Sequence, residues 1–245
     1  MSSPLVSVVI TTFNRAPLLR STFESFMKQE FKDYEVIVID DGSDEATPKL
    51  CAEPWPFSMT YHRMNRDRTL GYNNPARPNN VGVRMAKGDI IVLQNAEVRH
   101  SREVIQRLSE QCGTMNAVFA QVAVLDQYGQ SNSENRWYCH RTFSPRPFFF
   151  CGALRREWFE KLRGFDEDYQ YYGMDDVDFA DRLAKCGVEF HFTNIEVEHQ
   201  WHGCSFNSSD AKNNIPVMTY ARKTQEMADG KIGVERNLGR EWGAL

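Results

Sequence analysis

The sequence predicts an α/β fold, with a mostly parallel central sheet flanked by helices. Residues 6–10 and 36–39 are short, rich in β-branched side chains and almost free of polar groups, which is typical of strands buried on both faces. Between them, Pro17 suits the first turn of a helix. The apolar side chains that follow it at helical spacing are Leu19, Phe23, Phe26 and Met27. A strand, a helix and a second strand in this order indicate a βαβ unit with parallel strands.

Later segments continue the alternation of strands and helices. Further strands are predicted at residues 90–93, 117–125, 148–154 and 188–192, and further helices at residues 81–86, 104–112 and 177–186. Residues 54–80 are rich in Arg, Asn and Pro, so we expect them to form a loop over the sheet edge. Residues 126–144 are polar and are expected to form a surface excursion.

The bulk composition is that of an ordinary globular protein. The chain has 245 residues, of which 41% are hydrophobic and 25% charged, and its net charge is −4. This balance gives no global electrostatic reason to expect binding to nucleic acid or to an anionic membrane. The six cysteines are scattered without a CxxC pair, which favours reduced thiols. Because no run approaches the roughly 20 apolar residues of a membrane span, we expect a cytoplasmic protein without a transmembrane segment.

Polar clusters follow the predicted strands. Residues 11–15, 40–41 and 95–97 each come directly after a buried strand, where open α/β sheets bind their ligands. Two further clusters, at residues 171–178 and 196–202, are rich in carboxylates and histidine. These side chains suit a divalent cation such as Mg²⁺ or Mn²⁺, and such an ion would neutralise a diphosphate leaving group.

Four motifs in order give a specific resemblance. They are SVVITTFNR, VIVIDDGS, a Gly-Asp strand that ends in an acidic turn, and GFDE followed by GMDDVDFADRL. Together they resemble glycosyltransferase family 2 with the GT-A nucleotide-sugar fold, over roughly residues 5–202. The Asp-Asp…His region is similar to the chondroitin-polymerase-like and galactosyltransferase-like branches. The resemblance implies a catalytic domain at residues 1–205 and a partly helical extension at residues 206–245, on or near the acceptor side.

The resemblance also implies which residues bind the donor. Thr11 and Asp41 match positions that contact the nucleobase and ribose, and Thr12, Asn14, Arg15 and Asp40 lie beside them. For Asp40 and Asp41 the alternative is a turn or helix cap, which Asp-Gly-Ser favours without any ligand. Arg77 and Asn80 resemble a family segment near the sugar nucleotide, with loop solvation or capping as the alternative.

The acidic metal motif departs from the usual form of the family. Where the family commonly has Asp-x-Asp, this chain has LQNAEV, which is closer to Asn-x-Asp-Val with Asn95 and Glu97 in the matching positions. The resemblance implies that Glu97 is a metal ligand, and the alternative is a solvated charge at a strand end. His199 matches the histidine that completes the metal site in some branches. His202 is the second candidate, since either histidine could instead be a hydrogen-bonded surface residue.

The Asp175-Asp176 pair stands where the family usually has Glu-Asp. Asp176 therefore matches the catalytic base of inverting members, which takes a proton from the acceptor hydroxyl. The neighbouring Asp175 disfavours double ionisation, so one apparent pKa of the pair should rise. Both residues precede a predicted helix, and the alternative is that they cap it. Asp178 is expected to cap the helix or to pair with Arg182, four residues later.

These assignments imply a metal-dependent inverting glycosyltransferase. Its donor would be a nucleoside-diphosphate sugar, which we expect to be UDP-linked, and its acceptor a hydroxyl of a glycan or another molecule. Three alternatives are weighed against it. They are an inactive binding module, suggested by the missing Asp-x-Asp; a transferase that acts on modified nucleic acid, suggested by arginines at 63–77; and a nucleotidyltransferase, which TTFNRAPL disfavours because it contains no glycine.

Overall fold

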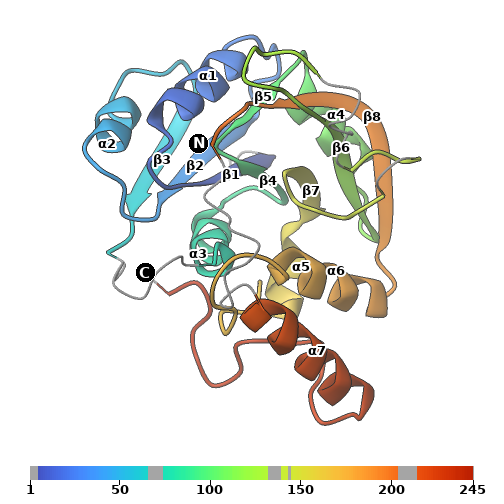
Figure 1. The fold of residues 1–245 in the computed structure, drawn as a ribbon. Coiled ribbons are helices and arrows are strands. Elements are labelled where there is room, and N and C mark those ends of the chain that lie inside the picture. The colour runs from blue at the N-terminus through green and yellow to red at the C-terminus, as the bar shows by residue number, and fades with distance from the viewer. Residues whose placement is uncertain (1–4, 66–73, 132–138, 143–144, 204–213, 245) are drawn as a thin grey trace.

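The computed structural model describes residues 5–65, 74–131, 139–142, 145–203 and 214–244 (Figure 1). In this part of the chain an eight-stranded sheet has the order β3-β2-β1-β4-β7-β6-β8-β5. The strands are β1 (Val6–Thr12), β2 (Tyr34–Asp40), β3 (Ser58–Arg63), β4 (Ile90–Asn95), β5 (Val98–His100), β6 (Asn116–Val124), β7 (Cys151–Arg155) and β8 (Glu189–His199). The helices are α1 (Ala16–Phe26), α2 (Ala46–Cys51), α3 (Ala76–Met85), α4 (Val104–Gln111), α5 (Arg156–Leu162), α6 (Asp175–Lys185) and α7 (Asn214–Ala228).

The first half of the sheet is parallel, as the sequence predicts. β3, β2, β1 and β4 are parallel neighbours. Their side chains alternate between two cores, so that Val8 packs on the side of Phe23 in α1 and Val9 on the side of Val81 in α3. Figure 1 shows α1 and α3 on opposite sides of these strands. The apolar strands are therefore buried on both faces, and the carboxyl ends of β1, β2 and β4 share one edge.

The second half of the sheet is mixed. β7 is antiparallel to both β4 and β6, whereas β8 is parallel to β6 and antiparallel to β5. β8 is eleven residues long, and in Figure 1 it runs from beside α6 back to β5. Its carboxyl end therefore lies next to the chain that leaves β4.

The C-terminal residues pack on α5 and α6. Trp242 is buried in the same core as Phe159 of α5 and Phe179 of α6. Arg182 of α6 is fully buried, and its guanidinium donates to Asp178 Oδ2 at 2.7 Å. Arg236, from the C-terminal segment, donates to the other oxygen of Asp178 at 3.1 Å. The predicted pairing of Asp178 with Arg182 is confirmed, and the C-terminal segment shares in it.

Several predicted boundaries are wrong. Residues 54–80 include β3, an edge strand whose half-exposed polar side chains hide its pairing with β2. The helix predicted at 81–86 begins at Ala76, because prolines that suggest a loop also fit the first turn of a helix. The helix predicted at 177–186 begins at Asp175. Met27 follows the last residue of α1, and 53% of its surface is exposed, so it is not part of the core.

Two bulk expectations can be compared with the structure. The cysteines in the described residues are free thiols, and they are Cys51, Cys112, Cys139, Cys151 and Cys186. Cys204 lies outside the described residues. Among the helices of the described ranges, none combines the length and the apolar character that a transmembrane span requires.

Candidate active site

The ends of β1, β2 and β4 bring the predicted donor-binding residues to one edge of the sheet. Thr11 is in register with Asn95 of β4, and Thr12 with Asp40 of β2. The backbone N–H of Asp41 donates to the carbonyl of Thr12 at 2.8 Å. The hydroxyl oxygen of Thr12 is buried and has no hydrogen-bond partner in the described part of the chain. A buried hydroxyl with unused hydrogen-bonding capacity is consistent with a ligand position.

Asp40 and Asp41 have different roles in the turn after β2. Asp40 is fully buried, and its carboxylate accepts from the Ser43 backbone N–H at 2.7 Å and from the Tyr61 hydroxyl at 2.6 Å. Burial and the contact with Asp40 raise the pKa of Tyr61, so this hydroxyl stays a donor. Both oxygens of Asp40 therefore hold the turn, which agrees with the alternative reading of this residue. Asp41 is 7% exposed at the same edge.

Asn14 joins the turn after β1 to the turn after β2. Its backbone is left-handed, with φ of 52°, its N–H donates to Ser43 Oγ at 2.8 Å, and its Oδ1 accepts from the Asp44 N–H at 2.8 Å. Asparagine tolerates this conformation better than most residues. The next residue, Arg15, caps α1 and places its Nε 3.7 Å from Glu97 Oε2. The β1–α1 turn therefore brings a positive charge to Glu97.

Glu97 lies between two histidines. Its Oε1 is 3.4 Å from His199 Nε2 and 3.5 Å from His202 Nε2, and the three candidate ligand atoms lie within 4.8 Å of one another. Asn95 Nδ2 donates to the same oxygen at 3.5 Å. One carboxylate and two imidazoles form a donor set that suits Mn²⁺ and related divalent ions and leaves positions for further ligands. The side chains therefore fit the predicted metal, and both candidate histidines lie beside Glu97.

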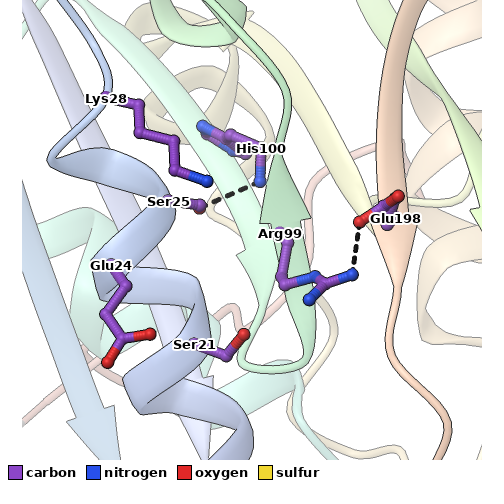
Figure 2. A pocket seen from close by; sticks show the side chains of 7 residues that line it. All are labelled: Ser21, Glu24, Ser25, Lys28, Arg99, His100 and Glu198. Atoms are coloured by element: carbon purple, nitrogen blue, oxygen red, sulfur yellow. Dashed lines mark hydrogen bonds and ion pairs between the residues drawn. The ribbon is translucent and has the colours of Figure 1, made fainter. Parts of the chain in front are cut away.

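Strand pairing explains why these distant residues meet. β5 follows Glu97 directly and pairs with the end of β8, with Val98 in register with His199. Figure 2 shows two contacts that hold β5 in place, the Arg99–Glu198 ion pair at 2.6 Å and the His100 N–H that donates to Ser25 Oγ of α1 at 3.0 Å.

Gln200 extends this pairing past the end of β8. Its backbone N–H donates to the Glu97 carbonyl at 3.0 Å, and its side-chain amide donates to the same carbonyl at 3.1 Å. The amide also donates to the Leu18 carbonyl of α1 at 3.1 Å. Gln200 thus anchors the chain between His199 and His202 to the backbone of Glu97.

Electrostatics keep Glu97 ionised. Burial alone would raise its pKa, but the imidazoles of His199 and His202 and the charge of Arg15 hold the pKa well below its usual value. The carboxylate is therefore negatively charged at neutral pH, the state that a metal ligand requires.

The Asp175–Asp176 pair opens helix α6. Asp175 is 5% exposed and accepts from Asn74 Nδ2 at 3.2 Å, whereas Asp176 is half-buried. Burial raises the pKa of Asp175 to about 6, although the hydrogen bond from Asn74 opposes this rise. Burial and then the charge of Asp175 raise the pKa of Asp176 well above its usual range. The N-cap residue is Met174, so neither carboxylate occupies the cap position.

A short segment before β7 connects the pair to the histidines. The backbone of Phe149 is hydrogen-bonded to Asp176. The ring of Phe150 lies edge-on to His199, with centroids 5.6 Å apart, and its carbonyl accepts from the Asn95 N–H at 3.0 Å. Two adjacent phenylalanines therefore connect Asp176, which contacts Phe149, with His199, which contacts Phe150.

Arg77 and Asn80 are placed differently from the other candidates. Both lie in α3 rather than in a loop; Arg77 is exposed and Asn80 is fully buried. The Asn80 amide donates to the Phe165 carbonyl and to Glu167, and its Oδ1 accepts from the Phe165 N–H at 2.8 Å. Asn80 thus joins α3 to the loop before α6, and the structure does not show its side chain at the strand ends.

Sequence reasoning missed two residues of this region. Tyr61, which binds Asp40, lies in the segment that was expected to be a loop. Asn74 contacts Asp175 across 101 residues, and no local pattern indicates such a contact. Part of the Arg-rich segment behind the nucleic-acid alternative, including Arg66 and Arg68, lies outside the described residues.

The fold is that of GT-A glycosyltransferases. The mannosyltransferase PcManGT from Pyrobaculum calidifontis, determined in complex with GDP-Man and Mn²⁺, is similar with a TM-score of 0.67 and 20% identity, over 92% of this chain and 65% of that one. GalNAc-T7, determined with UDP, GalNAc and Mn²⁺, is similar with a TM-score of 0.68 and 18% identity, over 91% of this chain and 48% of that one.

Sequence comparison then gives the family. The family described as Glycosyl transferase family 2 matches residues 7–176, from β1 to Asp176, and the chain belongs to this family. A chondroitin synthase from Escherichia coli is 24% identical in an alignment that covers 80% of this chain and 34% of that protein. The chain spans less than half the length of the first curated relatives that it matches.

Proposed function

We propose that the chain transfers a sugar from a UDP-linked donor to an acceptor hydroxyl, with inversion at the anomeric carbon and with dependence on Mn²⁺ or Mg²⁺. The observation that carries this proposal is the convergence of Glu97, His199 and His202 beside Arg15 at the ends of the parallel strands. The complexes named for the two similar structures, GDP-Man with Mn²⁺ and UDP with Mn²⁺, support a nucleotide-linked donor and a divalent metal.

The donor half of the site would act through charge. Glu97, His199 and His202 would hold the ion, which supplies positive charge to the diphosphate as the nucleotide leaves. Arg15 adds a fixed positive charge to the same region. Thr11, Thr12 and Asp41 would bind the nucleoside at the neighbouring strand ends. These groups lower the barrier by placing charge before the reaction begins.

The acceptor half would act through Asp176. Its carboxylate takes the proton of the acceptor hydroxyl while that oxygen attacks the anomeric carbon and the bond to the nucleoside diphosphate breaks. A raised pKa makes Asp176 a stronger base than an ordinary carboxylate. We place the acceptor near α6, where the described part of the C-terminal segment also packs. Its identity, whether glycan, another hydroxyl compound or modified nucleic acid, is an outcome of screening.

Calorimetric titration tests the donor site first. UDP, GDP, dTDP and CDP are each titrated with Mn²⁺, with Mg²⁺ and with EDTA. The proposal expects UDP to bind with a divalent ion and to lose that binding on chelation. Selective binding of another nucleotide would keep the transferase proposal and change its donor. Failure of all four to bind a folded protein would contradict the donor site.

Turnover of UDP-sugars tests the chemistry. Asp176→Asn is expected to lower kcat by about 100-fold or more while nucleotide binding is kept, because it removes only the base. Asp181→Asn is the matched control, since this half-buried carboxylate lies on the same helix and accepts from the Tyr220 hydroxyl of α7. A wild-type protein that binds UDP but turns over no donor with any acceptor would favour the inactive binding module.

A further inference from the structure

Asn74 ties the start of α3 to the start of α6. Its side chain is 3% exposed, and its Nδ2 donates to the Tyr171 carbonyl at 2.8 Å and to Asp175 Oδ1 at 3.2 Å. A longer contact of 3.4 Å reaches the Gly173 carbonyl. A buried amide that directs its donor group at a carboxylate in a distant segment forms a specific cross-link between the two segments.

The partners of Asn74 determine the orientation of its amide. Its Oδ1 accepts from the Ala76 N–H at 2.9 Å, at the first residue of α3. Because a backbone N–H only donates and the Tyr171 carbonyl only accepts, the nitrogen of the amide must face residues 171–175. Asn74 therefore holds the beginning of α3 with its oxygen and the beginning of α6 with its nitrogen.

The loop that Asn74 holds has an unfavourable backbone. Tyr171, Gly173 and Met174 have φ angles of 65°, 98° and 68°. The left-handed region suits glycine but disfavours tyrosine and methionine, so such a loop keeps its shape only when surrounding contacts impose it. Met174 is also the N-cap residue of α6, and its side chain makes no capping hydrogen bond. Contacts from outside the helix therefore determine how Asp175 and Asp176 are presented.

We propose that Asn74 is a positioning residue for the reaction, which orients Asp175 and the loop before it so that Asp176 faces the acceptor. This inference rests on the proposed function, because it gives Asn74 its role through the acid pair. In this proposal Asn74 acts through Asp175 and not on a reacting atom. Its removal should therefore slow the chemical step and leave the donor site, built from β1, β2 and β4, intact.

The test compares Asn74→Ala with Asn237→Ala. Asn237 is also a buried amide, which donates to the carbonyls of Arg163 and Phe165 and accepts from the Glu167 N–H, so it has the same kind of contacts without the acid pair. With UDP-sugar as donor, Asn74→Ala should lower kcat by roughly 10- to 100-fold and leave the donor KM within about twofold. Asn237→Ala should lower stability and leave kcat close to that of the wild type.

A second variant keeps the shape of the side chain. Asn74→Asp retains the oxygen that accepts from the Ala76 N–H but replaces the donor nitrogen with a second acceptor facing Asp175 and the Tyr171 carbonyl. It should reduce kcat at least as strongly as Asn74→Ala. A wild-type kcat in both Asn74 variants would overturn the proposal, as would equal loss of kcat in Asn74→Ala and Asn237→Ala.

Carboxyl titration by ¹³C NMR separates this proposal from the proposed function. Burial raises the pKa of Asp175, the hydrogen bond from Asn74 lowers it, and the charge of Asp178 raises it further. Asp176 is the adjacent carboxylate, and its pKa is raised by burial and by the charge of Asp175. The first deprotonation of the pair should therefore move to higher pH in Asn74→Ala and stay in place in Asn237→Ala. If no UDP-sugar is turned over but the shift is present, the proposed function fails and the contact between Asn74 and the acid pair still stands. Absence of the shift overturns the contact between Asn74 and the pair.

Discussion

Glu97 shows how one residue can be suited to metal binding without the motif usual in its family. The carboxylate is buried, yet His199, His202 and Arg15 keep its pKa low, so it is charged before any ion arrives. Its Oε1 lies 3.4 Å from one imidazole and 3.5 Å from the other. The departure from Asp-x-Asp therefore still leaves a carboxylate beside the two histidines.

Removal of the Glu97 charge should weaken metal binding. Glu97→Gln keeps the size of the side chain, and we expect it to lower Mn²⁺ affinity more than about tenfold, since even contacts outside the metal's own ligands are worth that much. Titration of Mn²⁺ followed by electron paramagnetic resonance measures it. Glu189→Gln is the control, because Glu189 also pairs with a histidine, His191, but on the exposed end of β8. Unchanged affinity in Glu97→Gln would contradict the assignment.

The two histidines should contribute together. His199→Ala and His202→Ala are each expected to weaken Mn²⁺ binding by about tenfold or more, because both Nε2 atoms face the same oxygen of Glu97. His191→Ala, on the exposed part of the same strand, should have no effect. If only one of the two variants loses affinity, the other histidine is not a ligand, and the site has one imidazole rather than two.

Among individual residues, the sequence predicted the carboxylates and His199 but did not decide their partners. Strand ends indicate where Glu97 lies, because a short apolar run ends there. Whether His202 joins His199 depends on how the chain turns at Gln200, whose contacts with the Glu97 carbonyl come from pairing far along the sequence. The same limit applies to Asp40, since its structural role follows from Tyr61 in a strand that the local composition conceals.

At the scale of elements, helix α6 begins with a carboxylate pair whose ionisation is made unfavourable by burial. The folded pKa of Asp175 is about 6, against an ordinary value of 3.8. Between these two pH values the folded protein binds more protons than the unfolded chain. The free energy of unfolding therefore falls as pH rises through this window. The charged pair thus lowers stability at the pH where a base would be used, which is common for functional sites.

Replacement of Asp175 should therefore stabilise the protein in a pH-dependent way. Asp175→Asn retains an oxygen for Asn74 and should raise the free energy of unfolding by about 2 kcal/mol above pH 7, with little change near pH ~3, where the carboxyl is mostly protonated in both states. Urea denaturation over this pH range measures it. Asp229→Asn is the control, because the pKa of this exposed carboxylate is lowered by Lys231 and Gln225 and its removal should not stabilise. An equal gain at low and high pH would contradict the explanation.

At the scale of the whole molecule, sequence patterns predicted the parallel half of the sheet better than the long-range contacts. β1, β2 and β4 are recognisable because burial on both faces leaves continuous apolar runs. The contacts of Asn74 and Asn80 bridge segments 85 to 101 residues apart and leave no periodic pattern. Proline-rich starts of helices and half-exposed edge strands have the composition of loops, so α3 and β3 were not predicted correctly.

The C-terminal segment is part of the same structural unit as α6. Arg236 is buried between Asp178 Oδ1 and Asp166 Oδ2, at 3.1 Å from each, and Lys223 also contacts Asp166. Arg182 neutralises the other oxygen of Asp178 from within α6. The helix that carries the acid pair is therefore held by charges from residues beyond the part of the chain that the family match covers.

Loss of Arg236 should destabilise the whole fold. Arg236→Ala leaves two buried carboxylates with one cation fewer, and breaking a buried pair in this way should lower the free energy of unfolding by about 3 kcal/mol. Arg222→Ala removes an exposed ion pair with Glu226 on α7 and should change it by less than about 0.5 kcal/mol. Urea denaturation at neutral pH compares the two variants. If both lose the same small amount, residues after α7 only rest on the surface of α6. A large loss confined to Arg236→Ala would show that its buried ion pairs with Asp166 and Asp178 support the fold, because only these pairs distinguish it from the exposed pair of Arg222.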